Sequence, residues 1–125
     1  MNDNVNNPKH YTSHPSGVEC IEIAEMLPFN LGNALKYLWR AGKKLDEVED
    51  IKKSVFYLRR QANSCFALQT RMSVASLQKE LIENYAIKIN KFDQELARIV
   101  AIICLKGNTE LLDLADELES QYGLN

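Results

Sequence analysis

Apolar residues recur every three or four positions through most of this 125-residue chain, the spacing that places them on one face of an α-helix. A long helix is expected from Glu47 to about Ala67, opened by a capping box of Asp46 and Glu49. Its apolar positions are Val48, Ile51, Val55, Leu58, Ala62, Cys65 and Phe66. No segment alternates with period two for long enough to predict a strand. With only 5 Gly and 3 Pro, the sequence predicts an all-α fold of five or six helices in one small domain.

Capping signals place two shorter helices before the long one, after an irregular arm of about 15 residues. Ser16 and Glu19 form a capping box for a helix over Val18–Leu27. Asn30 is expected to cap the second helix, which runs to Ala41 before a glycine stop.

The C-terminal half contains a helical pattern from Ser73 to Lys106, either continuous or interrupted near Asn90. Asn108 or Thr109 is expected to cap a last helix. The apolar residues at helical spacing in the first part of this half are Leu77, Leu81, Ile82, Tyr85, Ile89, Phe92 and Leu96. Such a stripe, with an acidic surface around it, favours packing or oligomerisation over chemistry.

Charge is segregated along the chain although its sum is only −2. Residues 36–60 hold eight basic and four acidic side chains, whereas residues 72–125 hold five basic and nine acidic ones. The near-neutral total argues against long nucleic acids as partners, and the longest apolar run, Ile99–Leu105, is too short to span a membrane. Three widely spaced cysteines and no secretion signal predict reduced thiols and a cytoplasmic location.

Two polar stripes carry the candidate site. The second helix presents Asn33, Lys36, Tyr37 and Arg40 on one face, followed at once by Lys43 and Lys44. The third helix carries Asp50, Lys53, Tyr57 and Arg60 on a stripe expected to lie opposite its apolar face. Arg supplies a planar fork and Lys a mobile point charge, a combination that binds phosphate oxygens. Two antiparallel helices joined by a short turn would bring both stripes around one basic, aromatic-lined site, although a solvated face is the alternative.

Other groups of residues extend or compete with this site. His10 and Tyr11 in the arm are candidates to close over a ligand, with His10 as a general acid or base. Glu19, Glu22 and Glu25 share a helix face, so a Mg²⁺ site is an alternative, but the sequence requires no cofactor and predicts no zinc site. The chain contains no P-loop motif.

An ordered series of motifs, H-Y, G-N-x-x-K-Y-x-x-R and E-D-x-x-K, resembles a phage nucleotide-kinase family over about residues 5–60. The segments that carry this resemblance are 8–11, 19–22, 31–44, 49–53 and 57–58. The resemblance implies phosphoryl transfer from a nucleoside triphosphate to a deoxynucleoside monophosphate. The positions that match its motifs are His10, Tyr11, Asn33, Lys36, Tyr37, Arg40, Lys44, Asp50 and Lys53. It also implies a phage protein that works in the cytoplasm of its host.

The resulting prediction is a nucleotide-kinase-like domain over residues 1–70 and a helical extension over 71–125 within the same globular unit. His10, Lys36 and Arg40 are the predicted catalytic residues. The predicted nucleotide-binding residues are Tyr11, Asn33, Tyr37, Lys43, Lys44, Asp50, Lys53 and Tyr57. The alternatives are an anti-defence protein that sequesters a nucleotide or cyclic nucleotide and, third, a Mg²⁺-dependent pyrophosphohydrolase. A short chain has no room for a deep cleft, so a homo-oligomer is expected.

Overall fold

The computed structural model describes residues 14–41, 47–64 and 76–124, and within them the chain forms six helices and no strand. The helices are α2 (Cys20–Ala24), α3 (Phe29–Arg40), α4 (Glu47–Ala62), α6 (Ser76–Asn90), α7 (Gln94–Leu105) and α8 (Asn108–Gln121). The predicted all-α fold of five or six helices is confirmed for this part of the chain. No helix among the described residues is long and apolar enough to cross a bilayer.

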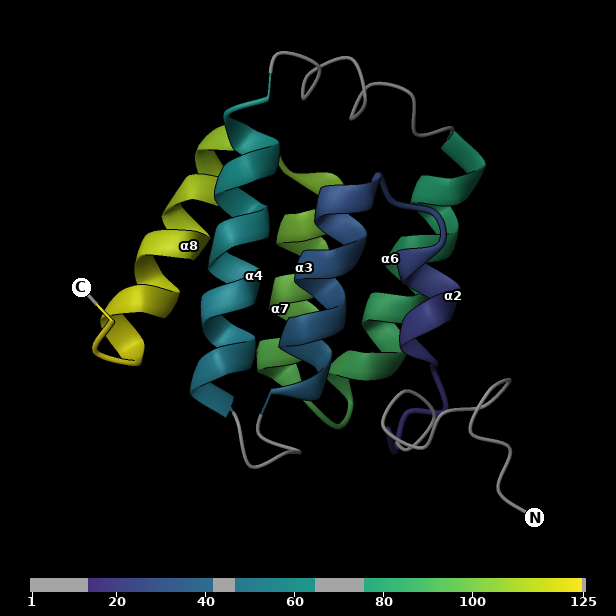
Figure 1. Cartoon of the computed structure of the whole chain (residues 1–125). Coiled ribbons are helices and arrows are strands. Elements are labelled where there is room, and N and C mark those ends of the chain that lie inside the picture. The colour runs from purple at the N-terminus through teal and green to yellow at the C-terminus, as the bar shows by residue number, and fades with distance from the viewer. Residues whose placement is uncertain (1–13, 42–46, 65–75, 125) are drawn as a thin grey trace.

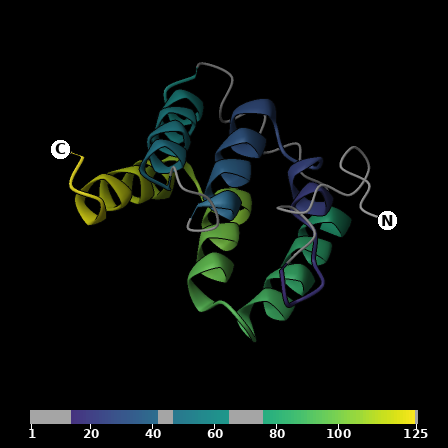
Figure 2. The same ribbon diagram turned by 60° about the horizontal axis from the view of Figure 1, so that its bottom comes forward.

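The helices form two layers. In Figure 2, α4, α3 and α2 lie in one layer and α8, α7 and α6 in the other. Figure 1 shows α3 and α4 side by side, with α7 behind them and α8 beyond α4. The contacts between α4 and α8, between α3 and α7 and between α6 and α7 agree with this arrangement. The core between the layers includes Trp39, Leu58, Ile82, Ile103 and Leu114, all nearly inaccessible to solvent.

Polar contacts at the edges fasten the two layers together. Arg59 of α4 bonds Asp116 at 2.8 Å and also Glu119, both on α8. These two hydrogen bonds raise the pKa of the Arg59 guanidinium above its ordinary value. At the other end, the Tyr85 hydroxyl of α6 donates to Glu22 of α2 at 3.0 Å. Each layer is therefore held to the other near both of its ends.

The helix before the site begins later than the sequence predicts. Glu19, rather than Ser16, is the N-cap of α2, and its backbone N–H donates to Glu22 Oε1 at 2.8 Å. The Ser16 hydroxyl is used in the preceding turn, where it accepts from the Val18 N–H and lies 2.7 Å from His14 Nδ1. The predicted start at Val18 is wrong because the capping box is formed three residues further along the chain.

The α3 helix starts at a proline instead of the predicted Asn30 cap. Pro28 occupies the N-cap position, and its carbonyl accepts the first helical hydrogen bond from the Gly32 N–H at 2.9 Å. A proline suits this place because its fixed φ fits a helix start and the first N–H groups have no helical partner in any case. The buried face of α3 is the one that its periodicity predicts: Leu31, Ala34, Leu35, Leu38 and Trp39.

The α4 helix ends at Ala62, short of the predicted Ala67, which lies outside the described residues together with the Asp46 cap. Its last turn tightens, because the Ser64 N–H bonds the Gln61 carbonyl only three residues back. Val48 was expected in the apolar stripe but is 46% exposed. The stripe from Ile51 through Leu58 is buried as predicted.

The long C-terminal pattern is interrupted just after Asn90. Asp93 caps α7 by accepting the Leu96 N–H at 3.0 Å. The predicted caps of α8 are wrong, because Gly107 holds the N-cap position and its N–H donates to Glu110 Oε2 at 3.0 Å. Leu81 and Phe92, expected on the packing face, are exposed.

Candidate ligand-binding site

The candidate site lies on the face where α3 and α4 run side by side. Tyr37 of α3 stacks on Tyr57 of α4 with ring centroids 6.1 Å apart and planes 6° from parallel. Phe29 and Phe56 meet the Tyr57 ring edge-on at 6.2 Å and 5.1 Å. Four aromatic rings from two helices therefore form one continuous surface, of which Phe29 is 76% exposed.

Three cations surround the Tyr37 ring, and we call Lys36, Arg40 and Lys53 the cation cluster. Lys36 Nζ lies 4.6 Å from the ring centroid, Lys53 Nζ 5.2 Å and Arg40 Cζ 5.7 Å. The two ammonium nitrogens are thus at most about 10 Å apart (4.6 Å plus 5.2 Å), close to the ~10 Å Debye length at 0.1 M salt. The ring face offsets part of the repulsion, by about 0.5–1 kcal/mol for each exposed cation.

Asp50 is the carboxylate that faces the cation cluster. Its Oδ2 lies 3.9 Å from Arg40 Nε, and within the described part of the chain neither of these buried atoms has a hydrogen-bond partner. The prediction that Asp50 lies opposite the apolar face of its helix is wrong, because the side chain is only 3% exposed. At 100° per residue, Asp50 falls about 40° from Ser54 and about 80° from Leu58, both of which are buried.

The charges do not cancel at this face. Three cations and one carboxylate leave a local charge of +2, and no described acidic group pairs with Lys36 or Lys53. Like charges held together on helix surfaces are destabilising. An anion seated between these side chains would relieve the repulsion and gain charge-assisted hydrogen bonds.

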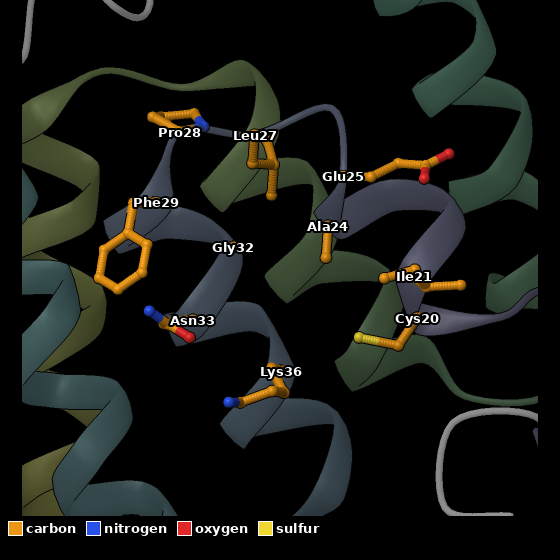
Figure 3. Close-up of a pocket in the computed structure, with 10 residues that line it drawn as sticks. All are labelled: Cys20, Ile21, Ala24, Glu25, Leu27, Pro28, Phe29, Gly32, Asn33 and Lys36. Atoms are coloured by element: carbon orange, nitrogen blue, oxygen red, sulfur yellow. The ribbon is translucent and has the colours of Figure 1, made fainter. Parts of the chain in front are cut away.

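A groove of about 270 Å³ opens between α2 and the first turns of α3, next to the cation cluster. Figure 3 shows its lining residues, with Lys36 at one end and Glu25 on the far side. The residues that line it are Cys20, Ile21, Ala24, Glu25, Leu27, Pro28, Phe29, Gly32, Asn33 and Lys36. Asn33 and Lys36 are the two predicted site residues among them. The sequence does not predict this groove, because it depends on how closely α2 approaches α3.

The structure brings together six predicted site residues: Asn33, Lys36, Tyr37, Arg40, Lys53 and Tyr57, with Asp50 beneath them. Arg60 lies at an exposed position near the end of α4. His10, Tyr11, Lys43 and Lys44 lie outside the described residues. The binding and catalytic roles assigned to all of these residues remain predictions.

The alternative Mg²⁺ site on α2 is not assembled. Glu22 is already engaged, since its Oε1 accepts the Glu19 N–H and its Oε2 accepts the Tyr85 hydroxyl. Burial, followed by the bond to Glu22, raises the pKa of Tyr85 above its ordinary value. Over the residues that the structure describes, no three His, Cys, Asp or Glu side chains gather as a metal site would require.

His14 ends the predicted irregular arm, but it is buried. Its ring packs against Trp39 with centroids 5.6 Å apart, and its Nε2 lies 3.8 Å from Asp93 Oδ2. Trp39 belongs to the buried face of α3, so His14 packs against that face of the helix. His14 is therefore a packing residue for the helix that carries the site.

Comparison with known proteins gives a family match for the N-terminal part of the chain. Residues 5–59 match the model of the DUF3310 family, which is described as a protein of unknown function. No curated protein and no solved structure matches the chain. The predicted membership of a phage nucleotide-kinase family is wrong, because the family that matches this segment has no function in its description. The phage origin and the anti-defence role lose the support of that resemblance. The matched segment nevertheless contains the whole cation cluster and the groove.

Proposed function

We propose that this protein binds a small phosphate-bearing ligand, with a nucleotide as the best-fitting class, on the face formed by α3 and α4. The observation that carries the proposal is the gathering of Lys36, Arg40 and Lys53 around one tyrosine ring with a net local charge of +2. Lys supplies a point charge and Arg a planar fork of N–H donors, and phosphate oxygens accept hydrogen bonds from both.

The aromatic surface favours a nucleotide over inorganic phosphate. Phe29, Tyr37, Phe56 and Tyr57 form a continuous set of rings beside the cations. Stacking of a base on an aromatic side chain contributes about 1–3 kcal/mol and tolerates any base. The acidic C-terminal half disfavours a long polyanion, so the ligand is expected to be a single nucleotide or another molecule of that size.

Phosphoryl transfer to a deoxynucleoside monophosphate and simple sequestration both start from this bound state. In the transfer reaction, Lys36 and Arg40 would stabilise charge on the transferred oxygens, since catalysis of this reaction is mainly positioning and electrostatics. Asp50 would hold the Arg40 guanidinium in place from beneath. Sequestration needs the same cations and no proton transfer, so the residues on this face support both outcomes.

The test measures binding and turnover on the same preparations. Titration calorimetry with the four common deoxynucleoside monophosphates is expected to show binding by the wild type. Lys53→Gln should weaken it about tenfold, as loss of one charge-assisted contact of about 1.5 kcal/mol implies. Lys88→Gln is the matched control, because Lys88 is also an exposed lysine but lies on α6. The proposal would be overturned if none of the four ligands bound, or if Lys53→Gln and Lys88→Gln lost affinity equally.

Turnover then separates the two outcomes. Incubation of a deoxynucleoside monophosphate with a nucleoside triphosphate should convert both into diphosphates if the protein is a transferase, because the phosphoryl group leaves the triphosphate and joins the monophosphate. A monophosphate recovered unchanged indicates sequestration. Release of pyrophosphate only with added Mg²⁺ would instead identify the hydrolase alternative.

Self-association and a cytoplasmic location belong to the same proposal. Leu81, Ile87 and Phe92 are exposed apolar side chains on α6 and just after it, and they support contact with a second copy. A monomeric mass in light scattering at micromolar concentration would contradict the oligomer. Nucleotides are abundant in the cytoplasm, which is where cell fractionation should find the protein.

A further inference from the structure

We propose that the groove between α2 and α3 holds the base of the nucleotide while the cation cluster holds its phosphate. This inference rests on the proposed function and assigns the ligand an orientation, in which Phe29, the ring of the aromatic surface that also lines the groove, contacts the base. Lys36 connects the two halves of the site, because it lines the groove and also lies 4.6 Å from the Tyr37 ring centroid. A ligand that reaches from the groove to Arg40 must pass this side chain.

The groove has the surface that a planar base requires. Ile21, Ala24, Leu27 and Pro28 provide apolar walls, and the exposed Phe29 ring stands at one side (Figure 3). The volume of about 270 Å³ is close to the lower end of ligand pockets, roughly 300 Å³, as expected for a site that takes part of a small molecule.

Gly32 sets the depth of the groove by allowing α2 to lie close to α3. A Cβ atom at this position would lie 3.2 Å from the Ala24 carbonyl oxygen, closer than most real contacts of that kind. A larger residue at Gly32 would push α2 away and change the distance between the groove walls. Gly32, the glycine of the G-N pair in the motif, therefore permits the close approach of α2 to α3, which the motif alone does not reveal.

Electrostatics decides which end of the ligand enters the groove. Glu25 lines the groove on the side away from Lys36, so a phosphate placed there would meet a carboxylate instead of cations. The Lys36 end leads to Arg40 and Lys53. The base must therefore occupy the Glu25 side and the phosphate the Lys36 side.

The spacing along α3 fits a ligand with a sugar between its two ends. Asn33 and Arg40 are seven residues apart, which is about 10 Å along a helix at 1.5 Å per residue. Inorganic phosphate cannot reach both ends of this span, whereas an extended nucleoside mono- or diphosphate can.

Asn33 is the side chain placed to distinguish one base from another. It lines the groove and is half-buried, and its amide offers both donors and an acceptor. Base edges carry complementary donors and acceptors. In protein–DNA complexes, a pair of hydrogen bonds from one amide side chain to a base edge distinguishes that base from the others. Asn33→Leu has nearly the same size and removes these groups, so it should narrow the affinity differences among the four bases.

The test compares ligands with and without a base on paired variants. The wild type should bind its preferred deoxynucleoside monophosphate at least tenfold more tightly than 2-deoxyribose 5-phosphate. Phe29→Ala should weaken binding of the monophosphate at least fivefold, which corresponds to the lower end of the range for one base–aromatic contact. It should leave the affinity for the sugar phosphate unchanged. Phe92→Ala is the matched control, since Phe92 is also exposed but lies between α6 and α7. Ala24→Leu, which fills the groove, should repeat the Phe29→Ala result.

The outcomes separate this inference from the proposed function. If Lys53→Gln weakens binding of the monophosphate but Phe29→Ala and Ala24→Leu do not, the ligand binds at the cation cluster and the assignment of the base to the groove is wrong. Equal affinity of the wild type for the monophosphate and the sugar phosphate also overturns it. If Lys53→Gln changes nothing, the proposed function itself fails.

Discussion

The Arg40–Asp50 pair gives the sharpest prediction about stability at the site. Asp50 is 3% exposed, the Arg40 side chain is 21% exposed, and Nε and Oδ2 are 3.9 Å apart. At that distance, an effective dielectric constant of 20 gives a Coulomb attraction of about 4 kcal/mol. Desolvation of the carboxylate opposes this attraction, and partial exposure of the guanidinium screens it. We therefore expect a coupling free energy of about 1–2 kcal/mol.

A double-mutant cycle measures this coupling. Arg40→Met should lower the free energy of unfolding by about 2–3 kcal/mol, because it leaves a buried carboxylate without its closest cation. Asp50→Asn should cost about 1 kcal/mol alone and much less in the Arg40→Met background, where no guanidinium remains to pair. The assay is urea unfolding of the four proteins, followed by the fluorescence of Trp39, the single tryptophan of the chain.

Additive changes in the free energy of unfolding would contradict the predicted coupling. Contacting residues that interact show coupling of about 0.5–3 kcal/mol, so a value below about 0.5 kcal/mol would mean that Arg40 and Asp50 are independent. The cycle repeated at high salt provides the control. Coupling that disappears there would show that solvent separates the two groups.

Two further predictions concern the edges of the two layers. Burial, then the 2.7 Å hydrogen bond to Glu47, raises the pKa of Tyr122 to about 12. Its contribution to stability should be complete below the unfolded value of ~10 and lost between about pH 10 and 12, by up to ~2.7 kcal/mol at 1.36 kcal/mol per unit. The pH dependence of urea unfolding checks this, and a Tyr122→Phe protein that loses as much stability over the same range would contradict it. Arg59→Met should lower the free energy of unfolding by about 1 kcal/mol, because it removes both ion pairs to α8. Arg60→Met, at an exposed position of the same helix, is the control and should lower it by less than ~0.5 kcal/mol. Equal losses of stability in thermal unfolding would show that the α4–α8 ion pairs contribute nothing.

Periodicity predicts the parts of this fold that depend on one buried face. The core face of α3 and the stripe from Ile51 to Leu58 follow directly from apolar spacing, because burial of those side chains dominates the free energy of folding. Caps are harder to predict, since Ser16 and Glu19 both have suitable side chains and the choice depends on what else binds them. Ser16 is engaged by His14, which leaves the cap to Glu19.

The sequence predicts which side chains gather at the candidate site, but it does not predict the burial of Asp50 or the groove beside the cation cluster. The spacing of Lys36, Tyr37 and Lys53 places them on adjacent faces of an antiparallel helix pair, and the structure brings them around one ring. The burial of Asp50 depends on how closely α3 approaches α4, which no single-helix pattern contains. The groove depends on the approach of α2 to α3 at Gly32, again a property of two helices.

Binding of a nucleotide to the α3–α4 face is tested most directly by chemical-shift mapping on the ¹⁵N-labelled protein. The full chain is titrated with each of the four deoxynucleoside monophosphates. We expect saturable changes in chemical shift that are largest at the amides of Asn33–Arg40 and Asp50–Tyr57, for at least one of the four ligands. Changes centred on α6, α7 or α8, or no saturable change with any ligand at millimolar concentration, would contradict it.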